Sequence, residues 1–294
     1  MVSTLAHLRF PFSYFLLPVY LFALALSPNL GEKRLLWSFI IIHVLLYPAS
    51  NGYNSYFDKD EKSIGGLKNP PPVNKSLYYA ALGLDVLAVV LGWYFINAPF
   101  AILLFVYGLV SKAYSHPLVR LKKYPVGGWI TVSVFQGFFT FLMCYVGING
   151  FGWGNNLLQA KVLVPAGLST LLLLGTYPMT QVYQHEEDAA RGDRTLSLML
   201  GIRGTFWFVL VVFTVATVAY AGYFHFFLAD RYVGVFLLAL APVVIYFLVW
   251  FYRVYQNPAA ANYGSTMWLN FLSATCLNAF FVWLFIDVSH IGQL

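Results

Sequence analysis

The sequence has little charge and almost no cysteine. Its 294 residues include only 17 Lys and Arg and 11 Asp and Glu, which is 10% of the chain, against about 25% in an ordinary soluble domain. Both cysteines, Cys144 and Cys276, fall inside apolar runs, where a thiol behaves as a small hydrophobe and implies no disulfide framework. The basic residues are spread over short loops, so we expect no nucleic-acid partner. The composition therefore argues against a soluble domain, a disulfide-stapled domain and a nucleic-acid-binding protein.

The sequence instead contains many long apolar runs. Hydrophobic residues make up 60% of the chain and aromatic residues 19%, and the mean hydropathy is +0.71. We expect an all-α polytopic membrane bundle of about nine transmembrane helices, two four-helix halves plus a final helix, in a single integral-membrane domain over residues 1–294. The first run lacks a small-residue cleavage site, and we expect it to be a retained helix. Runs of bilayer-spanning length predict helices near 11–28, 35–57, 77–95, 98–115, 126–148, 160–184, 204–227, 232–253 and 265–288.

The distribution of Lys and Arg predicts the orientation of these helices. One side holds the N-terminus and the loops after the second, fourth, sixth and eighth helices, and the other side has only Lys33, Arg34, Lys161 and Arg231. By the positive-inside rule, we expect the N-terminus and the loops after the even-numbered helices to face the cytoplasm. That side carries the other thirteen basic residues: Arg9, Lys59, Lys62, Lys68, Lys75, Lys112, Arg120, Lys122, Lys123, Arg191, Arg194, Arg203 and Arg253.

The acidic residues gather in two short stretches. Acids contribute little to membrane topology, so their clustering needs another reason. Each stretch follows the second helix of a predicted four-helix half, and two such halves would bring their acids together at one mouth of the bundle. Seven of the eleven acids belong to these stretches: Asp58, Asp60 and Glu61 in the first, and Glu186, Glu187, Asp188 and Asp193 in the second.

Carboxylates crowded at helix ends beside a bilayer repel one another and lose hydration, which indicates that a cation is present. Oxygen ligands without Cys or His partners favour a hard ion such as Mg²⁺, which takes one or two carboxylates and completes its shell with water and phosphate oxygens. Nearby Lys and Arg suit an anionic diphosphate. A diphosphate held in this way becomes a good leaving group, and aromatic faces stabilise the allylic cation that it leaves behind.

Three motifs resemble those of the UbiA superfamily of intramembrane prenyltransferases. Asn54-Ser-Tyr-Phe-Asp58-Lys-Asp60 resembles the first motif, an Asn followed four residues later by Asp at the end of the second helix. Gln184-His-Glu-Glu-Asp188-Ala-Ala-Arg-Gly192-Asp193-Arg194-Thr195-Leu196 resembles the second, in which Asp is followed by Gly and Thr-Leu. Tyr114-Ser115-His-Pro117-Leu-Val-Arg120-Leu-Lys122 resembles the Tyr-Ser-x-Pro segment after the fourth helix. With nine predicted spans, the resemblance covers essentially the whole chain.

The resemblance implies a helical bundle whose Asp-rich motifs bind Mg²⁺ and the diphosphate of a prenyl donor. Asn54 and Asp58 match the first motif, and Asp188 matches the last Asp of the second. Two positions depart from the pattern, because Lys62 and Gln184 stand where many members have Asp, and the usual metal shell does not simply carry over. Gln184 still offers a neutral carbonyl ligand.

We therefore expect a rearranged Mg²⁺ site that uses Asp58 with Asp60 or Glu61, and Glu187 with Asp188. Residues three or four apart share a helix face, so Asp58 can point together with Glu61, and Gln184 can pair with either Glu187 or Asp188. Asp60 can join only where the chain has left the helix. Asp58 and Asp188 are the expected catalytic residues. The full set of metal candidates is Asn54, Asp58, Asp60, Glu61, Gln184, Glu187 and Asp188, and that of diphosphate candidates is Arg9, Lys68, Lys112, Tyr114, Arg120, Lys122, Arg191 and Arg194.

The expected activity is Mg²⁺-dependent transfer of an isoprenoid chain from a prenyl diphosphate to an aromatic or other lipophilic acceptor in the bilayer. A UbiA-type terpene cyclase that uses no acceptor is the alternative. A transporter would spread its ionisable residues through the membrane, and a non-catalytic relative would bind no prenyl diphosphate.

Several other residues have a structural and a functional interpretation. Asp85 lies inside a span, where an acid is by default a functional candidate, but we favour a hydrogen bond to a neighbour. For His185 and His116 we favour solvated and structural roles. Six tyrosines could line the path of a cation: Tyr53, Tyr56, Tyr107, Tyr114, Tyr177 and Tyr183.

Overall fold

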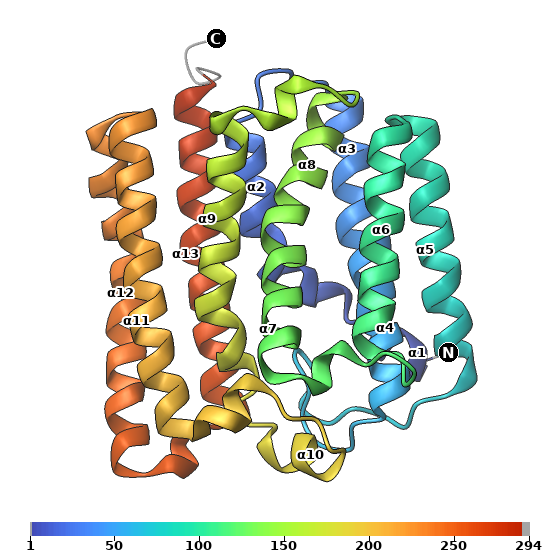
Figure 1. Cartoon of the computed structure of the whole chain (residues 1–294), viewed down its shortest axis with the longest axis vertical. Helices are drawn as coiled ribbons and strands as arrows, with labels where there is room; N and C mark the ends of the chain where they lie inside the picture. The colour runs from blue at the N-terminus through green and yellow to red at the C-terminus, as the bar shows by residue number, and fades with distance from the viewer. Residues whose placement is uncertain (1, 290–294) are drawn as a thin grey trace.

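The computed structural model describes residues 2–289, and those residues form an all-helical bundle (Figure 1). Nine segments among them are long and apolar enough to cross a bilayer, and each overlaps one of the nine predicted spans, although the first begins at Val2 instead of residue 11. The α-helices are α1 (Val2–Leu8), α2 (Leu17–Ala25), α3 (Glu32–Ile40), α4 (Tyr47–Asp58), α5 (Lys75–Phe95), α6 (Ala98–Ser115), α7 (Pro125–Val134), α8 (Thr140–Asn149), α9 (Ala160–Thr176), α10 (His185–Ala190), α11 (Leu196–Phe227), α12 (Asp230–Gln256) and α13 (Tyr263–Val288).

Several spans contain a break that hydropathy alone does not predict. In the first, α1 ends before Arg9, and a 3₁₀ turn over Phe10–Leu16 leads into α2. In the second, a π-helical turn over Ile41–Leu46 precedes Pro48. Proline removes an N–H and crowds the preceding turn, and a wider turn relieves that crowding. A second π-helical turn, Phe135–Phe139, joins α7 to α8.

The sixth and seventh spans differ from their predicted bounds. The sixth was expected to reach residue 184, but α9 ends at Thr176 and a 3₁₀ turn over Tyr177–Thr180 contains Pro178. The seventh starts earlier than residue 204, because α11 begins at Leu196 and bends at Gly201. Gly201 has φ 69°, a left-handed conformation that glycine adopts without strain. Both changes shape the segment that carries α10.

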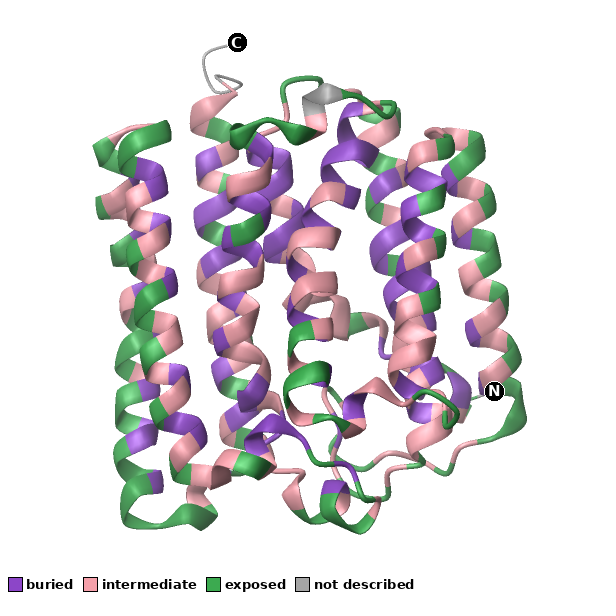
Figure 2. Ribbon diagram, viewed as in Figure 1, coloured by how far each residue is buried: buried purple, intermediate pink, exposed green. Residues whose placement is uncertain are grey.

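The helices form a closed ring. Consecutive spans pack against one another, and α13 returns to pack against α2. Phe22, Phe141 and Phe281 are completely or almost completely buried in the core, and the rings of Phe22 and Phe281 stack with centroids 4.7 Å apart. Figure 2 shows exposed positions along the outer helices, and these include large apolar side chains such as Trp93 and Leu238. An apolar outer face suits contact with lipid.

The two acidic stretches lie together at one end of the bundle, as the sequence predicts. Figure 1 shows α10 beside the loop that joins α4 to α5. The Glu187 carboxylate accepts hydrogen bonds from the backbone N–H groups of Glu61 at 3.1 Å and Lys62 at 2.9 Å. Side chains of the two stretches also pair, through Lys62 with Glu186 and Asp60 with Arg191.

Candidate active site

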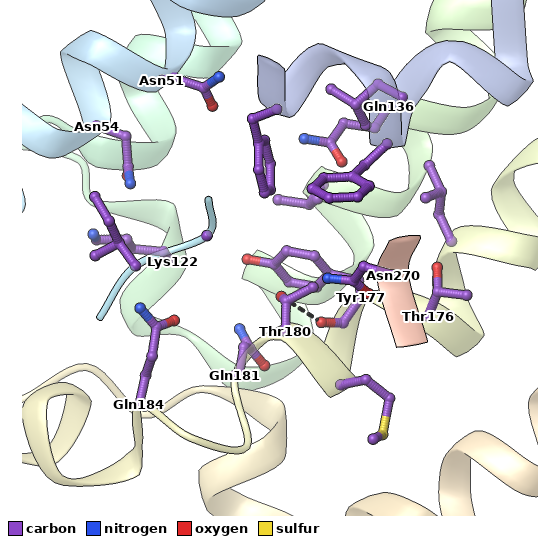
Figure 3. A pocket seen from close by; sticks show the side chains of 18 of the residues that line it. Asn51, Asn54, Lys122, Gln136, Thr176, Tyr177, Thr180, Gln181, Gln184 and Asn270 are labelled. Carbon is purple, nitrogen blue, oxygen red and sulfur yellow. Dashed lines mark hydrogen bonds between the residues drawn. The ribbon is translucent and has the colours of Figure 1, made fainter. Parts of the chain in front are cut away.

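A cavity of about 330 Å³ extends from this acidic end into the bundle. Its lining comes from both predicted halves and from the last helix, including residues of α4, α6, α9, α11, α12 and α13. Figure 3 shows part of that lining. We call the end of the cavity formed by the charged residues the mouth, and the remainder the chamber. The charged lining residues of the mouth are Arg9, Asp58, Asp60, Lys122, Asp188, Arg191 and Asp193.

The sequence around α4 explains how the first motif reaches the mouth. Asn51, Asn54 and Asp58 are spaced by three and four residues, so they share one face of the helix, and all three line the cavity. The helix ends at Asp58, and Lys59 takes φ 50°. Because the chain leaves helical geometry at Lys59, Asp60 can line the same cavity. The sequence predicts that Asp60 joins the site only under this condition.

The four aspartates of the mouth are paired with three cations. Asp58 contacts Lys122 and lies 3.6 Å from Arg120. Arg120 also binds both oxygens of Asp193, at 2.7 and 2.8 Å, in a bidentate geometry that favours Arg over Lys. Pairing accounts for how carboxylates that are almost wholly buried remain in a low-dielectric site.

Arg191 joins the two motifs. Its guanidinium contacts Asp60, which belongs to the first motif. It also contacts two residues of the second motif, Asp188 at 2.8 Å and Asp193 at 3.5 Å. The Thr195 hydroxyl donates to the second Asp188 oxygen at 3.3 Å. One side chain therefore holds together segments that are far apart in the sequence.

The paired cations compensate the carboxylates unequally. Burial raises the pKa of Asp188 to about 6 despite the neighbouring Arg191. Burial and the nearby Asp58 also hold the pKa of Asp60 above its usual value. Burial likewise opposes ionisation of Asp193, but Arg120, Lys122 and Arg191 outweigh it and leave its pKa below the usual value. Asp60 and Asp188 therefore have capacity for more positive charge than the protein supplies.

Some predicted metal candidates do not reach the cavity wall. Glu61 is exposed. One carboxylate oxygen of Glu187 is occupied by the loop N–H groups described above, although the other is buried with no partner among the described residues. Gln184 does line the cavity, and its amide N–H lies 3.5 Å from the Ser63 carbonyl. Asn54 also lines it and accepts from the Ser115 hydroxyl at 2.6 Å.

The predicted diphosphate ligands divide in the same way. Arg9, Tyr114, Lys122 and Arg191 line the cavity, and Arg120 contacts the network from behind. The Arg9 guanidinium donates to the carbonyls of Gly65 at 2.9 Å and Asn51 at 3.3 Å, and no carboxylate in the described chain lies within ion-pair distance of it. Arg9, Lys59 and Arg120 are the non-glycine residues with positive φ in the described part of the chain, so backbone strain gathers near this mouth.

Two predicted diphosphate ligands are exposed, and a third lies inside the membrane. Lys68 and Arg194 have exposed side chains and do not line the cavity. Lys112 pairs with Asp85 between α5 and α6, and it lies over the Tyr53 ring at 5.1 Å. The interpretation of Asp85 as a partner for a neighbouring side chain is therefore confirmed. Lys112 serves that structural pair instead of the cavity.

The aromatic and amide lining adds residues that the motifs did not indicate. Four of the six tyrosines line the cavity, namely Tyr107, Tyr114, Tyr177 and Tyr183, whereas Tyr53 and Tyr56 pack against Tyr78. Figure 3 shows the amides of Asn51, Gln136 and Asn270 among the lining side chains. His185 hydrogen-bonds Ser197 at 2.8 Å and does not belong to the lining.

The donor set suits Mg²⁺ better than a metal enclosed by protein ligands. Within residues 2–289, no group of three or more His, Cys, Asp or Glu side chains gathers closely enough to hold an ion alone. Mg²⁺ takes one or two carboxylates and fills its other positions with water and phosphate oxygens. Asp58, Asp60 and Asp188 at one mouth, two of them with raised pKa values, fit that requirement.

Comparisons with known proteins identify the fold and the family. The fold resembles a UbiA homologue from Archaeoglobus fulgidus solved with GPP and Mg²⁺, at a TM-score of 0.66 and 16% identity over 98% of this chain and 100% of that one. It also resembles a structure from a study of digeranylgeranylglyceryl phosphate synthase, at a TM-score of 0.60 and 18% identity over 95% and 96% of the two chains. A search of the curated proteins finds no match. The sequence matches the model of the UbiA prenyltransferase family over residues 15–285, and the chain belongs to that family.

Proposed function

We propose that the protein transfers an isoprenoid chain from a prenyl diphosphate to a lipophilic, aromatic acceptor inside the membrane, with Mg²⁺ as cofactor. The observation that carries the proposal is the meeting of the two acidic stretches at the mouth of one cavity, whose chamber has no charged lining residue in the described chain. Charge at one end and an uncharged, largely aromatic and aliphatic interior match a ligand with a diphosphate head and a hydrocarbon tail.

The mouth holds the diphosphate. Arg9 is the cation of the lining without a carboxylate partner in the described chain, and an anionic head would supply one. Lys122 and Arg191 line the same mouth and can exchange part of their contact with Asp58, Asp60 and Asp188 for phosphate oxygens. Arg120 keeps its bidentate contact with Asp193 and thereby positions the loop that carries Lys122.

Asp58, Asp60 and Asp188 are the aspartates from which Mg²⁺ would take its one or two carboxylates, with Asn54 and Gln184 as neutral oxygen ligands. When bound, the ion neutralises the developing charge on the departing diphosphate. Glu187, one of whose oxygens is buried without a hydrogen-bond partner among the described residues, adds negative potential at Asp60. We propose that the mouth and the N-terminus face the cytoplasm, as the distribution of Lys and Arg predicts.

The chamber binds the hydrocarbon chain of the donor and the acceptor, and the new bond forms there. The bond between donor C1 and the diphosphate oxygen breaks, and its electron pair leaves with the diphosphate. An acceptor atom then forms a bond to C1 and gives up a proton to the diphosphate or to water at the mouth. Tyr107, Tyr114, Tyr177 and Phe135 line the intervening space, and their π-faces can stabilise the positive charge on the way.

The proposal is tested with purified protein in detergent and a panel of prenyl diphosphates and aromatic acceptors, with products identified by mass spectrometry. We expect a prenylated acceptor that requires Mg²⁺, and we expect Asp58→Asn and Asp188→Asn to reduce turnover by about 10² or more. Formation of a hydrocarbon or terpene alcohol without acceptor would indicate the cyclase instead. Unchanged turnover in both variants would exclude the proposed site.

A further inference from the structure

The chamber contains hydrogen-bonding groups but no charge. Beyond the mouth, its described lining consists of aromatic, aliphatic, hydroxyl and amide side chains. Besides the proposed metal ligands, four amides line it: Asn51 of α4, Gln136 of the π-helical turn, Gln181 at the end of the 3₁₀ turn, and Asn270 of α13. Figure 3 shows all four in the cavity lining.

Two of these amides, Asn51 and Asn270, have no protein partner among the described residues, whereas Gln136 lies against the Tyr107 hydroxyl and Gln181 accepts from the Ser197 N–H. The Asn51 Nδ2 atom is buried and has no partner among the described residues, and the Asn270 side chain makes no hydrogen bond within residues 2–289. Several of the lining hydroxyls are engaged, since Ser111 bonds Ser50, and Thr176 and Thr180 bond backbone carbonyls.

Unpaired amides in a membrane interior are unfavourable unless a ligand completes them. Each amide offers both a donor and an acceptor, so the matching group is a hydroxyl or carbonyl. A carboxylate would need a cation, because an unpaired charge in a low-dielectric chamber is strongly disfavoured. The cations of the lining lie at the mouth, where the proposed function assigns them to the diphosphate.

We propose that Gln136 and Asn270 select an uncharged acceptor, a phenol or hydroquinone ring without a carboxylate or phosphate substituent. This inference rests on the proposed function for the acceptor's role, but the recognition itself is a property of the chamber. The acceptor's hydroxyl donates to an amide carbonyl and accepts from an amide N–H. The donated hydrogen bond also increases the electron density of the ring that attacks the prenyl cation.

The test is equilibrium binding of matched compounds to the donor-free, full-length protein. 4-Hydroxybenzamide and 4-hydroxybenzoate have the same shape and differ by one charge, and the carboxamide and acid of 1,4-dihydroxynaphthalene extend the pair to a larger ring. We expect the carboxamide that binds more tightly of the two to have at least about tenfold higher affinity than the carboxylic acid of the same ring. Equal or tighter binding of both acids, or no measurable binding of any of the four, would overturn the inference.

Variants locate the recognition. Asn270→Leu and Gln136→Leu remove an amide at similar volume, and each should weaken carboxamide binding about tenfold. Asn278→Leu is the matched control: Asn278 is a buried amide on the same helix that does not line the cavity, so its substitution should leave binding unchanged. Carboxamide binding unaltered in both chamber variants would refute the assignment, and melting temperatures identify a variant that fails to fold.

A separate titration keeps the two proposals apart. Binding of geranyl thiolodiphosphate with Mg²⁺ reports on the donor site, whose charged contacts lie at the mouth. If that ligand binds but the acids are preferred in the chamber, the inference fails and the proposed function stands. If the carboxamides bind but the thiolodiphosphate does not, the proposed function fails and the chamber assignment stands.

Discussion

At the scale of single residues, Arg191 has the largest expected effect on the mouth because it contacts carboxylates of both motifs. Removing it leaves Asp60 and Asp188 buried without their cation, and an uncompensated buried charge is strongly unfavourable. We expect Arg191→Gln to raise the donor KM and lower kcat/KM by about 10². Arg191→Lys should recover only part of the loss, because a lysine cannot contact both carboxylates through a planar fork. Steady-state kinetics with varied donor measure both.

The pair formed by Asp85 and Lys112 gives a residue-scale prediction about stability. Both side chains are largely buried, with 13% and 19% exposure. Removing one partner by Asp85→Asn or Lys112→Met should destabilise the protein by about 3–5 kcal/mol, whereas the double variant should lose much less. Thermal unfolding in detergent measures this cycle.

The kinetics of the same variants separate a structural role from ligand binding. Lys112 was a diphosphate candidate from the sequence, but its position implies an unchanged donor KM in Lys112→Met. A donor KM that rises in Lys112→Met and not in Asp85→Asn would show that Lys112 binds the diphosphate after all.

At the scale of helices, close approach depends on Gly137. A Cβ atom there would lie 2.5 Å from the Thr170 Cα, so any side chain forces the π-helical turn away from α9. We expect Gly137→Ala to destabilise the protein by about 1–3 kcal/mol. Gly167→Ala is the control on α9, since nothing lies within 4 Å of its Cβ position, and it should be neutral or stabilising by about 0.5–1 kcal/mol. Thermal unfolding measures the stability of both variants. A Gly137→Ala protein more stable than Gly167→Ala would contradict the close packing at Gly137.

The helices themselves were predictable from the sequence, but their interruptions were not. Hydropathy indicates a span wherever about 20 apolar residues recur, and it found all nine within the described residues. It does not respond to Pro48 widening a turn or to Pro178 ending α9 early. These local backbone events decide which side chains face the cavity.

The motif residues of the candidate site were predictable because they stand in recognisable sequence patterns, whereas two of its chamber amides, Gln136 and Asn270, stand in none. Asn54, Asp58 and Asp188 stand in recognisable patterns, and they line the cavity. Asn51 could have been found from its helical spacing to Asp58. Gln136 and Asn270 stand alone in apolar spans, and so does Asn278, which does not line the cavity. Only the packing of the helices decides which of these three amides lines the cavity. The three-dimensional structure likewise places Lys112 and Glu61 outside the cavity lining.

At the scale of the whole molecule, orientation in the membrane follows from the distribution of charge. We predict that the mouth faces the cytoplasm and that the loop between α8 and α9 faces the opposite side. In a background with Cys144→Ser and Cys276→Ser, a cysteine at exposed Glu186 should react with a membrane-impermeant maleimide only from the cytoplasmic side. A cysteine at exposed Trp153 should react only from the other side. The reverse labelling pattern would invert the topology.

The central claim is that both acidic stretches bind one diphosphate through Mg²⁺ at a shared mouth. Its most direct test is the affinity for geranyl thiolodiphosphate, with and without Mg²⁺, in the unaltered protein, in Asp58→Asn, in Asp188→Asn and in the double variant. The account predicts Mg²⁺-dependent binding that each single substitution weakens by about tenfold or more, with a double variant short of additivity because both residues serve one ligand. Binding that does not require Mg²⁺, or that persists in the double variant, would contradict it.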